Sequence, residues 1–195
     1  MRQNFSTGFQ LYPAAIEDAL TAYQWLINES GLNSLKIAIA GDSAGGNLVL
    51  ETLLSLRNAE KALPSAAFVI SPYVDLARTG KTIQTKADVD LMVTLDLLES
   101  INSMYLPSGN FQDPEVSPLY ADLSKLPPLL IHVGTEEVLL DDSLRLARQA
   151  ALAGVAVELK VWHGMIHCMH LFAPMLSEAR DAISEAGAFL KHHLK

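Results

Sequence analysis

A short apolar run that ends at a glycine-flanked serine constrains this chain more than any other feature. The run covers residues 35–40 and leads into the pentapeptide Gly-Asp-Ser-Ala-Gly at 41–45, after which a helical pattern of apolar residues begins. We interpret the segment as a strand, a sharp turn and a helix. The turn is tight, so we expect a Cβ atom at Gly41 or Gly45 to collide with neighbouring backbone. Such a turn presents the Ser43 hydroxyl at the rim of a sheet.

The position of Ser43 directly before a helix favours chemistry at an oxyanion. The first N–H groups of a helix have no partner within the helix and can donate to negative charge. We therefore expect the N–H of Ala44 to form part of an oxyanion site next to the hydroxyl. Short glycine–serine patterns occur by chance in many proteins, but the strand before this one and the helix predicted after it are the context that the motif requires.

Size and charge exclude several classes of function. With 195 residues and 50% hydrophobic content, the chain is long enough to bury a core as one domain. Its formal net charge of −8 argues against nucleic acids and anionic membranes as partners, and no apolar run is long enough to span a bilayer. Residues 1–12 lack the apolar region of a secretory signal. Cys168 is the only cysteine, so we expect no internal disulfide and a cytoplasmic location.

Strand-like and helix-like segments alternate along the chain. Apolar residues at helical spacing predict helices at 14–28, 47–61, 94–105, 141–153 and 176–194. Short apolar or alternating runs predict strands at 35–40, 66–71, 129–133 and 155–162. Strands joined by helices imply a parallel sheet with right-handed crossovers. We therefore predict an α/β fold with a mainly parallel sheet of about four strands flanked by helices.

A serine hydroxyl needs a base and a carboxylate before it can act as a nucleophile. In a parallel sheet we expect both in loops at the carboxyl ends of later strands. Of the six histidines, His132 lies within a predicted strand and two are near the C-terminus; the others are His163, His167 and His170. A zinc site among these three is disfavoured because Gly164 interrupts the helix that such a site needs and no glutamate lies between them. We therefore predict no metal and take His167 as the best base.

The loop after the third predicted strand offers four carboxylates that could orient His167. They are Glu136, Glu137, Asp141 and Asp142. The two aspartates stand where a helix begins, so N-capping and pairing with the helix dipole explain them without catalysis. The two glutamates lie closer to the end of the strand, and spacing alone does not separate them.

These motifs together resemble the hormone-sensitive-lipase-type branch of the α/β-hydrolases, a group of bacterial esterases and lipases. The similarity extends over nearly all of the chain from Tyr12 onward. The matching segments are 12–19 (YPAAIEDA), 41–47 (GDSAGGN), 71–75 (SPYVD), 117–119 (SPL), 134–142 and 164–167 (GMIH). The resemblance implies a single, N-terminally truncated α/β-hydrolase domain over 1–195, with 76–118 as a partly irregular, cap-like insertion.

The resemblance also implies a role for each candidate residue. Ser43 maps to the nucleophile, His167 to the general base and Glu137 to the acid that orients the base. Most members of the family have aspartate at the acid position, but either carboxylate supports the chemistry. Asp141 is the alternative acid, and we favour Glu137 because capping accounts for Asp141. The chain order serine, acid, histidine is the one expected for this fold.

The function implied by the resemblance is hydrolysis of small acyl esters without a cofactor. Ser43 would attack the acyl carbon, His167 would relay the proton, and water would then release the acid. Hydrolysis of amides or peptides is a weaker alternative, because nothing in the sequence indicates recognition of a peptide. Residues that could line an apolar acyl pocket, although simple packing explains them better, are Met92, Leu97, Leu98 and Met104.

The family also carries a His-Gly-Gly-Gly segment upstream of the serine, whose N–H groups supply further oxyanion donors. These 195 residues contain no such segment, and the loss of one donor typically costs about 10²–10³ in turnover. In the family's strand order the strand before Ser43 becomes an edge, which invites pairing with another chain. We therefore expect a homo-oligomer, or a second polypeptide that completes the site. The alternative function is a degenerate or partial hydrolase that binds a ligand or partner with little turnover.

Overall fold

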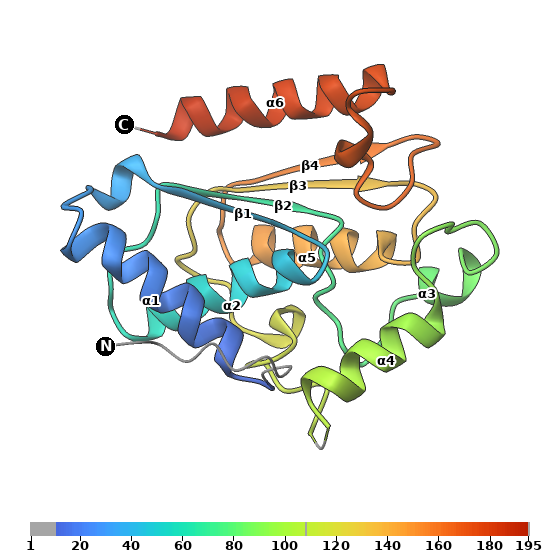
Figure 1. Ribbon diagram of the computed structural model, residues 1–195, viewed down its shortest axis with the longest axis horizontal. Helices are drawn as coiled ribbons and strands as arrows, with labels where there is room; N and C mark the ends of the chain where they lie inside the picture. Colours follow the sequence, from blue (N-terminus) through green and yellow to red (C-terminus); the bar gives the residue numbers. More distant parts are fainter. Residues whose placement is uncertain (1–10, 108, 195) are drawn as a thin grey trace, which may run out of the picture.

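A four-stranded sheet lies at the centre of the computed structural model, which describes residues 11–107 and 109–194 (Figure 1). The strands are β1 (Ala38–Asp42), β2 (Ala66–Ile70), β3 (Leu129–Gly134) and β4 (Val157–Trp162), and they lie side by side in that order. All neighbouring strands pair in parallel, as predicted. The loops that follow the strands therefore meet at one edge of the sheet. Residues 1–10, where the sequence predicts no secretory signal, lie outside the described residues.

Helices cover both faces of the sheet and bury its apolar residues (Figure 1). On one face lie α1 (Ala14–Asn28), α2 (Ala44–Asn58) and α5 (Leu140–Leu152), and on the other lies α6 (Ser177–His193). The main core forms under the first group, where Leu50, Val69 and Leu146 are fully buried. On the opposite face, Phe189 of α6 packs in one cluster with Phe68 of β2. None of the helices described has both the length and the apolar character needed to cross a bilayer.

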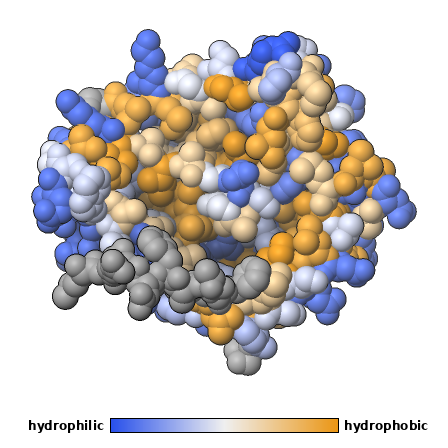
Figure 2. All heavy atoms as spheres, viewed as in Figure 1, coloured by the Kyte–Doolittle hydropathy of each residue, from blue (hydrophilic) through white to orange (hydrophobic). Residues whose placement is uncertain are grey.

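β1 forms an edge of the sheet, as predicted. Within the described residues it pairs only with β2. All five residues of β1 are partly or fully exposed, whereas every residue of β3 is buried. β1 lies in front in Figure 1, and in the same view the middle of the molecular surface is largely apolar (Figure 2). The described part of the chain therefore leaves this strand partly uncovered.

The boundaries of the elements differ from the prediction mainly at turns. A 3₁₀ turn at Ser34–Lys36, in which the Asn33 side chain accepts a hydrogen bond from the N–H of Leu35, delays the start of β1. Helix α2 begins at Ala44 rather than at 47, because the serine turn leads directly into it. The sequence did not predict α3 (Thr82–Thr85) or a 3₁₀ turn at Met169–Phe172. Both are too short to show a hydrophobic period.

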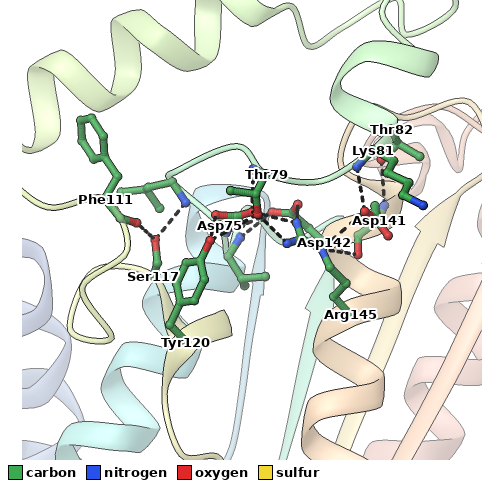
Figure 3. A network of polar contacts seen from close by, with 12 residues as sticks. Asp75, Thr79, Lys81, Thr82, Phe111, Ser117, Tyr120, Asp141, Asp142 and Arg145 are labelled. Carbon is green, nitrogen blue, oxygen red and sulfur yellow. Dashed lines mark hydrogen bonds and ion pairs between the residues drawn. The ribbon is translucent and has the colours of Figure 1, made fainter.

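A polar network ties the long connection between β2 and β3 to α5 (Figure 3). Arg145 of α5 donates hydrogen bonds to Asp75 at 2.8 Å and to Asp142 at 3.0 Å, and both carboxylates are buried. The hydroxyl of Tyr120 donates to the other oxygen of Asp75 at 2.8 Å. The connection also contains α4 (Leu95–Tyr105). The network fixes the loop after β2 against the start of α5, and the loop before α5 carries Glu137.

Candidate active site

Ser43 occupies a strained turn between β1 and α2. Its backbone angles are φ 52° and ψ −118°, and a positive φ is uncommon for any residue other than glycine. A Cβ at Gly41 would lie 2.2 Å from the carbonyl oxygen of Gly45, so the turn requires glycine there, as predicted. The expectation for Gly45 is wrong, because a Cβ at that position would meet only a side-chain oxygen at 3.6 Å, an ordinary contact. The second constrained position is Gly46, whose Cβ would lie 2.7 Å from that of Pro72.

Backbone hydrogen bonds hold the Ser43 turn against the end of β2. The N–H of Ser43 donates to the carbonyl of Ile70 at 2.8 Å, and its carbonyl accepts from the N–H of Tyr73 at 3.1 Å. Ser43 is partly exposed, and Ala44, which follows it, is an exposed first residue of α2. The N–H groups in the first turn of a helix have no acceptor within the helix. The turn thus places a serine hydroxyl next to the N–H of Ala44, which donates no backbone hydrogen bond within the described residues.

Glu137 and His167 form a buried hydrogen-bonded pair. The Nδ1 atom of His167 lies 2.9 Å from Oε2 of Glu137. His167 is only 5% exposed and Glu137 is 0% exposed. The other carboxylate oxygen, Oε1, accepts hydrogen bonds from the Ser71 hydroxyl at 2.8 Å and from the N–H of Gly134. Both oxygens of Glu137 are therefore engaged. A carboxylate held in this way fixes the orientation of the imidazole it contacts.

The loops after β3 and β4 pack directly against each other around this pair. The N–H of Glu136 donates to the carbonyl of Met165 at 3.0 Å. Gly134 permits this approach, because a Cβ there would lie 2.1 Å from the same carbonyl oxygen. The Ser71 hydroxyl accepts from the N–H of Cys168 at 3.2 Å, so the end of β2 contacts both loops. Three strand ends thus converge on the acid and the histidine.

The end of β2 holds both the segment that carries Ser43 and the segment that carries His167. The N–H of Ser43 is anchored on Ile70, and Cys168, the residue after His167, is anchored on Ser71. In the described ranges no hydrogen bond joins the Ser43 hydroxyl to His167, whose ring contacts Glu137. Hydrogen bonds between catalytic groups are often long before a substrate binds and tighten in the complex. Adjacent residues of one strand end therefore anchor the segments that carry the serine and the histidine.

The environment of His167 favours its protonated form. Burial lowers the pKa of this imidazole, but contacts with Cys168 and Glu137 outweigh burial and raise the pKa above the ordinary value of 6.5. The negative charge of a carboxylate next to the ring stabilises the imidazolium. The ring therefore becomes neutral, and able to accept a proton, at a higher pH than an isolated histidine.

Asp141, the alternative acid, serves a different part of the structure. Its carboxylate accepts the N–H of Lys81 at 2.8 Å and lies 3.5 Å from Nε of Arg145 (Figure 3). It does not cap α5 as the sequence predicts, because the helix begins earlier, at Leu140, and its N-cap residue is Leu139. Asp141 lies in the first turn of the helix, where its charge still complements the helix dipole.

The two remaining candidate carboxylates are engaged elsewhere. Glu136 forms an ion pair of 3.3 Å with Lys86, and Asp142 is buried against Arg145. Of the four carboxylates that the sequence leaves open, Glu137 is therefore the one that contacts His167. The side chain that holds Glu137 in place, Ser71, was not singled out from the sequence. Its local signals are its position at the end of the predicted strand 66–71 and at the start of the matching segment 71–75.

The other histidines near the last strands lie apart from this pair. His132 is fully buried in β3, and its Nδ1 lies 3.0 Å from Nε2 of His170. The pKa of His132 is lowered to about 3, mainly by burial. Burial also lowers the pKa of His170. His163 is exposed. Among residues 11–107 and 109–194, no three or more His, Cys, Asp or Glu side chains form a group that could hold a metal ion.

An apolar cavity of about 240 Å³ borders the Ser43 turn. Ala44 and Gly45 are part of its wall, together with residues of α1, α2, α4 and the loop after β2. Its largely apolar part is formed by Ala15, Leu48, Leu76, Ile101 and Tyr105. The cavity thus borders Ala44 and Gly45, the two residues that directly follow Ser43.

The sequence suggested other residues for an apolar pocket. Leu98 packs in a separate buried cluster, and the other three side chains are exposed: Met92, Leu97 and Met104. None of the four belongs to the cavity wall. Helix α4 instead contributes Ile101 and Tyr105, which are four residues apart and share one face. The face of α4 that lines the cavity depends on how this helix packs against the rest of the chain. The spacing of residues within the helix does not determine that packing.

A parallel sheet with a strained serine turn between strand and helix, and an acid–histidine pair at later strand ends, is the architecture of an α/β hydrolase. A family model described as the alpha/beta hydrolase fold matches residues 10–171. The chain belongs to this family.

Named relatives agree with this assignment. An acetyl-hydrolase of Streptomyces hygroscopicus is 42% identical over 180 residues, which are 92% of this chain and 60% of the relative. An esterase of Acinetobacter venetianus is 36% identical over 91% of this chain and 59% of its own length. The crystal structure of an esterase from the bacterial hormone-sensitive lipase family is 43% identical, with a TM-score of 0.93 over 95% of this chain and 62% of that one. The chain thus spans about three fifths of the length of the relatives it matches.

Proposed function

We propose that this chain is a carboxylic ester hydrolase that acts on small acyl esters with Ser43, His167 and Glu137. The observation that carries the proposal is the buried 2.9 Å contact between His167 and Glu137, at strand ends next to the strained turn of Ser43. The names of the acetyl-hydrolase and esterase relatives support the same reaction class. No cofactor is required, because serine, imidazole and carboxylate together supply nucleophile, base and orienting charge.

In the proposed reaction, His167 takes the proton from Ser43 as its oxygen attacks the carbonyl carbon of the ester. The carbonyl oxygen becomes an oxyanion and accepts a hydrogen bond from the N–H of Ala44. His167 then gives the proton to the leaving alcohol, and an acyl-serine remains. Water loses a proton to His167, attacks the acyl carbon and releases the carboxylic acid with regeneration of Ser43. Glu137 holds the imidazole and stabilises its charged form throughout.

A short-chain chromogenic ester tests the proposal. The purified chain should release 4-nitrophenol from 4-nitrophenyl acetate or butyrate at a rate that Ser43→Ala reduces to background. Ser184→Ala, which alters an exposed serine of α6, is the matched control and should retain the native rate. Equal background rates in the native chain and Ser43→Ala would instead favour the alternative, a partial hydrolase that binds a ligand or partner with little turnover.

We also propose that the chain self-associates through the edge strand β1. Its partly uncovered residues and a hollow of about 310 Å³ beside it, lined in part by Gly41, Phe68 and Leu171, support this proposal. Exposed sheet edges pair readily with another strand. Light scattering after size exclusion should give a multiple of 21.2 kDa, and Ala40→Lys, which adds a charge at an exposed edge position, should give a monomer. A native monomer would contradict the proposal.

We propose that residues 76–118 form a cap-like insertion within a single domain. Leu76 and Ile101 contribute to the cavity wall, and the hydroxyl of Tyr73 donates to Asn102 of α4 at 3.0 Å, which supports this role. Tyr73→Phe should raise KM for a short ester more than it lowers kcat. A single cooperative unfolding transition is expected for one domain, and two separated transitions would contradict it.

A cytoplasmic location is proposed on the cysteine content alone. Cys168 is buried and unpaired, which is typical of proteins from a reducing compartment. Cell fractionation with an antibody against the chain tests the proposal. Recovery in an extracellular or membrane fraction would contradict it.

A further inference from the structure

Glu51 is a buried carboxyl that the proposed reaction does not use. It lies on α2 and is only 3% exposed. One of its oxygens accepts a long hydrogen bond of 3.4 Å from the hydroxyl of Tyr105. The other, Oε1, has no hydrogen-bond partner within the part of the chain that the structure describes. Buried polar groups nearly always have partners, so this oxygen requires an explanation.

Glu51 belongs to the wall of the apolar cavity next to the Ser43 turn. Asn47 belongs to the same wall, and its Oδ1 atom is likewise without a partner among the described residues. The orientation of the Asn47 amide is fixed, because its nitrogen donates to the carbonyls of Tyr73 at 2.9 Å and Val116 at 3.1 Å. Two residues in the wall of an otherwise apolar cavity therefore each carry a buried oxygen with unused hydrogen-bonding capacity.

Asn47 and Glu51 are four residues apart and so lie on one face of α2, and Ser43 is the residue that directly precedes this helix. A helix rises about 1.5 Å per residue, which places Glu51 roughly 12 Å beyond Ser43 along the axis. Side chains of a helix lean toward its N-terminus, so the carboxyl of Glu51 lies closer to Ser43 than its Cα does. An extended chain advances roughly 1.2 Å per bond, so about six atoms beyond the reacting carbonyl cover roughly 7 Å, and the Glu51 side chain, which leans back along the helix, covers part of the remainder.

The charge state of Glu51 defines the complementary ligand. Burial raises the pKa of Glu51 to about 8, against the opposing effect of the Tyr105 hydrogen bond. At neutral pH the carboxyl therefore carries its proton and is both a donor and an acceptor. A hydroxyl accepts from this proton and donates to the oxygen of Asn47. An ammonium group would bind here only as an ion pair with ionised Glu51, which costs the desolvation of both charges.

We propose that this cavity binds an ester chain whose far end carries a hydroxyl group, which Glu51 and Asn47 recognise by hydrogen bonds. The inference deepens the proposed function, on which it rests, by naming the substrate class. A chain that ends in a methyl group leaves both polar atoms unpartnered, whereas a hydroxyl satisfies both. The hydroxylated chain belongs either to the acyl part or to the alcohol part of the ester, and the experiment distinguishes these two sources.

Two substrate pairs that differ by hydroxyl against methyl test the proposal. The acyl pair is the 4-nitrophenyl esters of 6-hydroxyhexanoic and heptanoic acid, and the alcohol pair is 6-hydroxyhexyl and heptyl acetate. In one of the two pairs, kcat/KM for the hydroxylated ester should be roughly tenfold higher than for its methyl counterpart. This ratio corresponds to the contribution of about one good hydrogen bond. The pair that shows the preference identifies the source. A ratio near one, or a preference for methyl, in both pairs would overturn the proposal.

Variants at Glu51 assign the preference to this residue. Glu51→Met keeps the volume but removes the hydrogen bonds, so the hydroxyl-to-methyl ratio should fall to about one. Glu51→Gln is neutral like the protonated acid and also offers a donor and an acceptor, so it should retain most of the preference. Thermal melting confirms that both variants fold. A preference that survives in Glu51→Met would overturn the proposal.

A binding measurement separates this inference from the proposed reaction. Calorimetry on Ser43→Ala compares N-methyl-6-hydroxyhexanamide with N-methylheptanamide, and N-(6-hydroxyhexyl)acetamide with N-heptylacetamide. Tighter binding of one hydroxylated amide, lost in the double variant with Glu51→Met, would support the cavity assignment even if no ester were hydrolysed. Ester hydrolysis without any hydroxyl preference in rate or binding would overturn the cavity assignment and leave the proposed function intact.

Discussion

His167 and Glu137 lie 30 residues apart in the chain and 2.9 Å apart in space, with both side chains almost completely buried. The opposite oxygen of Glu137 accepts hydrogen bonds from Ser71 and from the N–H of Gly134, which stand at the ends of β2 and β3. The acid is thus held by the ends of two strands while it faces a histidine beyond a third. This arrangement engages Nδ1 of the ring with Glu137, and the proposed reaction uses the other ring nitrogen for proton transfer.

The acid assignment predicts unequal effects of two isosteric substitutions. Glu137→Gln should lower kcat/KM for a short ester by roughly 10³–10⁴, because the amide no longer stabilises the imidazolium or its productive tautomer. Asp141→Asn should lower it less than about tenfold, since Asp141 contacts Lys81 and Arg145 instead of His167. Initial rates with 4-nitrophenyl butyrate measure both. The opposite ranking would transfer the acid role to Asp141.

The raised pKa of His167 predicts an acid limb in the pH profile. The imidazole accepts a proton only when it is neutral, so kcat/KM should fall as the pH drops through this pKa. Contacts with Cys168 and Glu137 outweigh burial and raise the pKa, so the midpoint should lie above 6.5. Rates between pH 5 and pH 10 locate it. An unchanged rate down to pH 5 would contradict the role of His167 as base.

The network around Arg145 predicts a large loss of stability on its removal. Arg145→Met leaves Asp75 and Asp142 buried without their cation, which should lower the free energy of unfolding by about 2–4 kcal/mol. Arg148→Met, on the exposed face of the same helix, is the matched control. This substitution should change the free energy of unfolding by less than about 0.5 kcal/mol. Urea unfolding followed by circular dichroism compares them. Similar midpoints for the two variants would show that the network contributes little.

The raised pKa of Glu51 predicts that the free energy of unfolding decreases as the pH rises. Its pKa is raised to about 8 in the folded state, whereas the unfolded chain has the ordinary value near 4.5. Between these values the unfolded state has already lost the proton that the folded state keeps, so stability falls with rising pH and levels off above about 8. Thermal melts at pH 5 and pH 8 should show a smaller difference for Glu51→Gln than for the native chain. An equal difference in both would contradict a neutral, buried Glu51.

Much of the fold and part of the site could be predicted from local patterns. The parallel sheet follows from strands that alternate with helices, and the strained turn follows from glycines around Ser43. The placement of Glu137 and His167 directly after strands brings them to one edge of a parallel sheet. In each case a short segment already contains the physical cause, and the sheet only brings the segments together.

The errors concern contacts between distant segments. Gly46 rather than Gly45 is constrained, because Pro72 of the next strand end approaches it. Asp141 does not cap its helix, because the helix begins one residue earlier, and its carboxylate instead accepts a hydrogen bond from Lys81 on another loop. In the sequence, Glu51 is simply one polar residue in an apolar helix. Its place in the wall of a cavity depends on α4, which forms another part of that wall. Such roles depend on which surfaces meet, and no local period encodes that.

Covalent labelling with a fluorophosphonate tests the central assignment most directly, because such probes react with a serine that a neighbouring base activates. Mass spectrometry of a tryptic digest should find the adduct on Ser43, in the peptide that spans residues 37–57. Labelling should be lost in His167→Ala and strongly reduced in Glu137→Gln. Absence of an adduct on Ser43 in the folded native chain, or equal labelling of Ser43 in His167→Ala, would contradict the account.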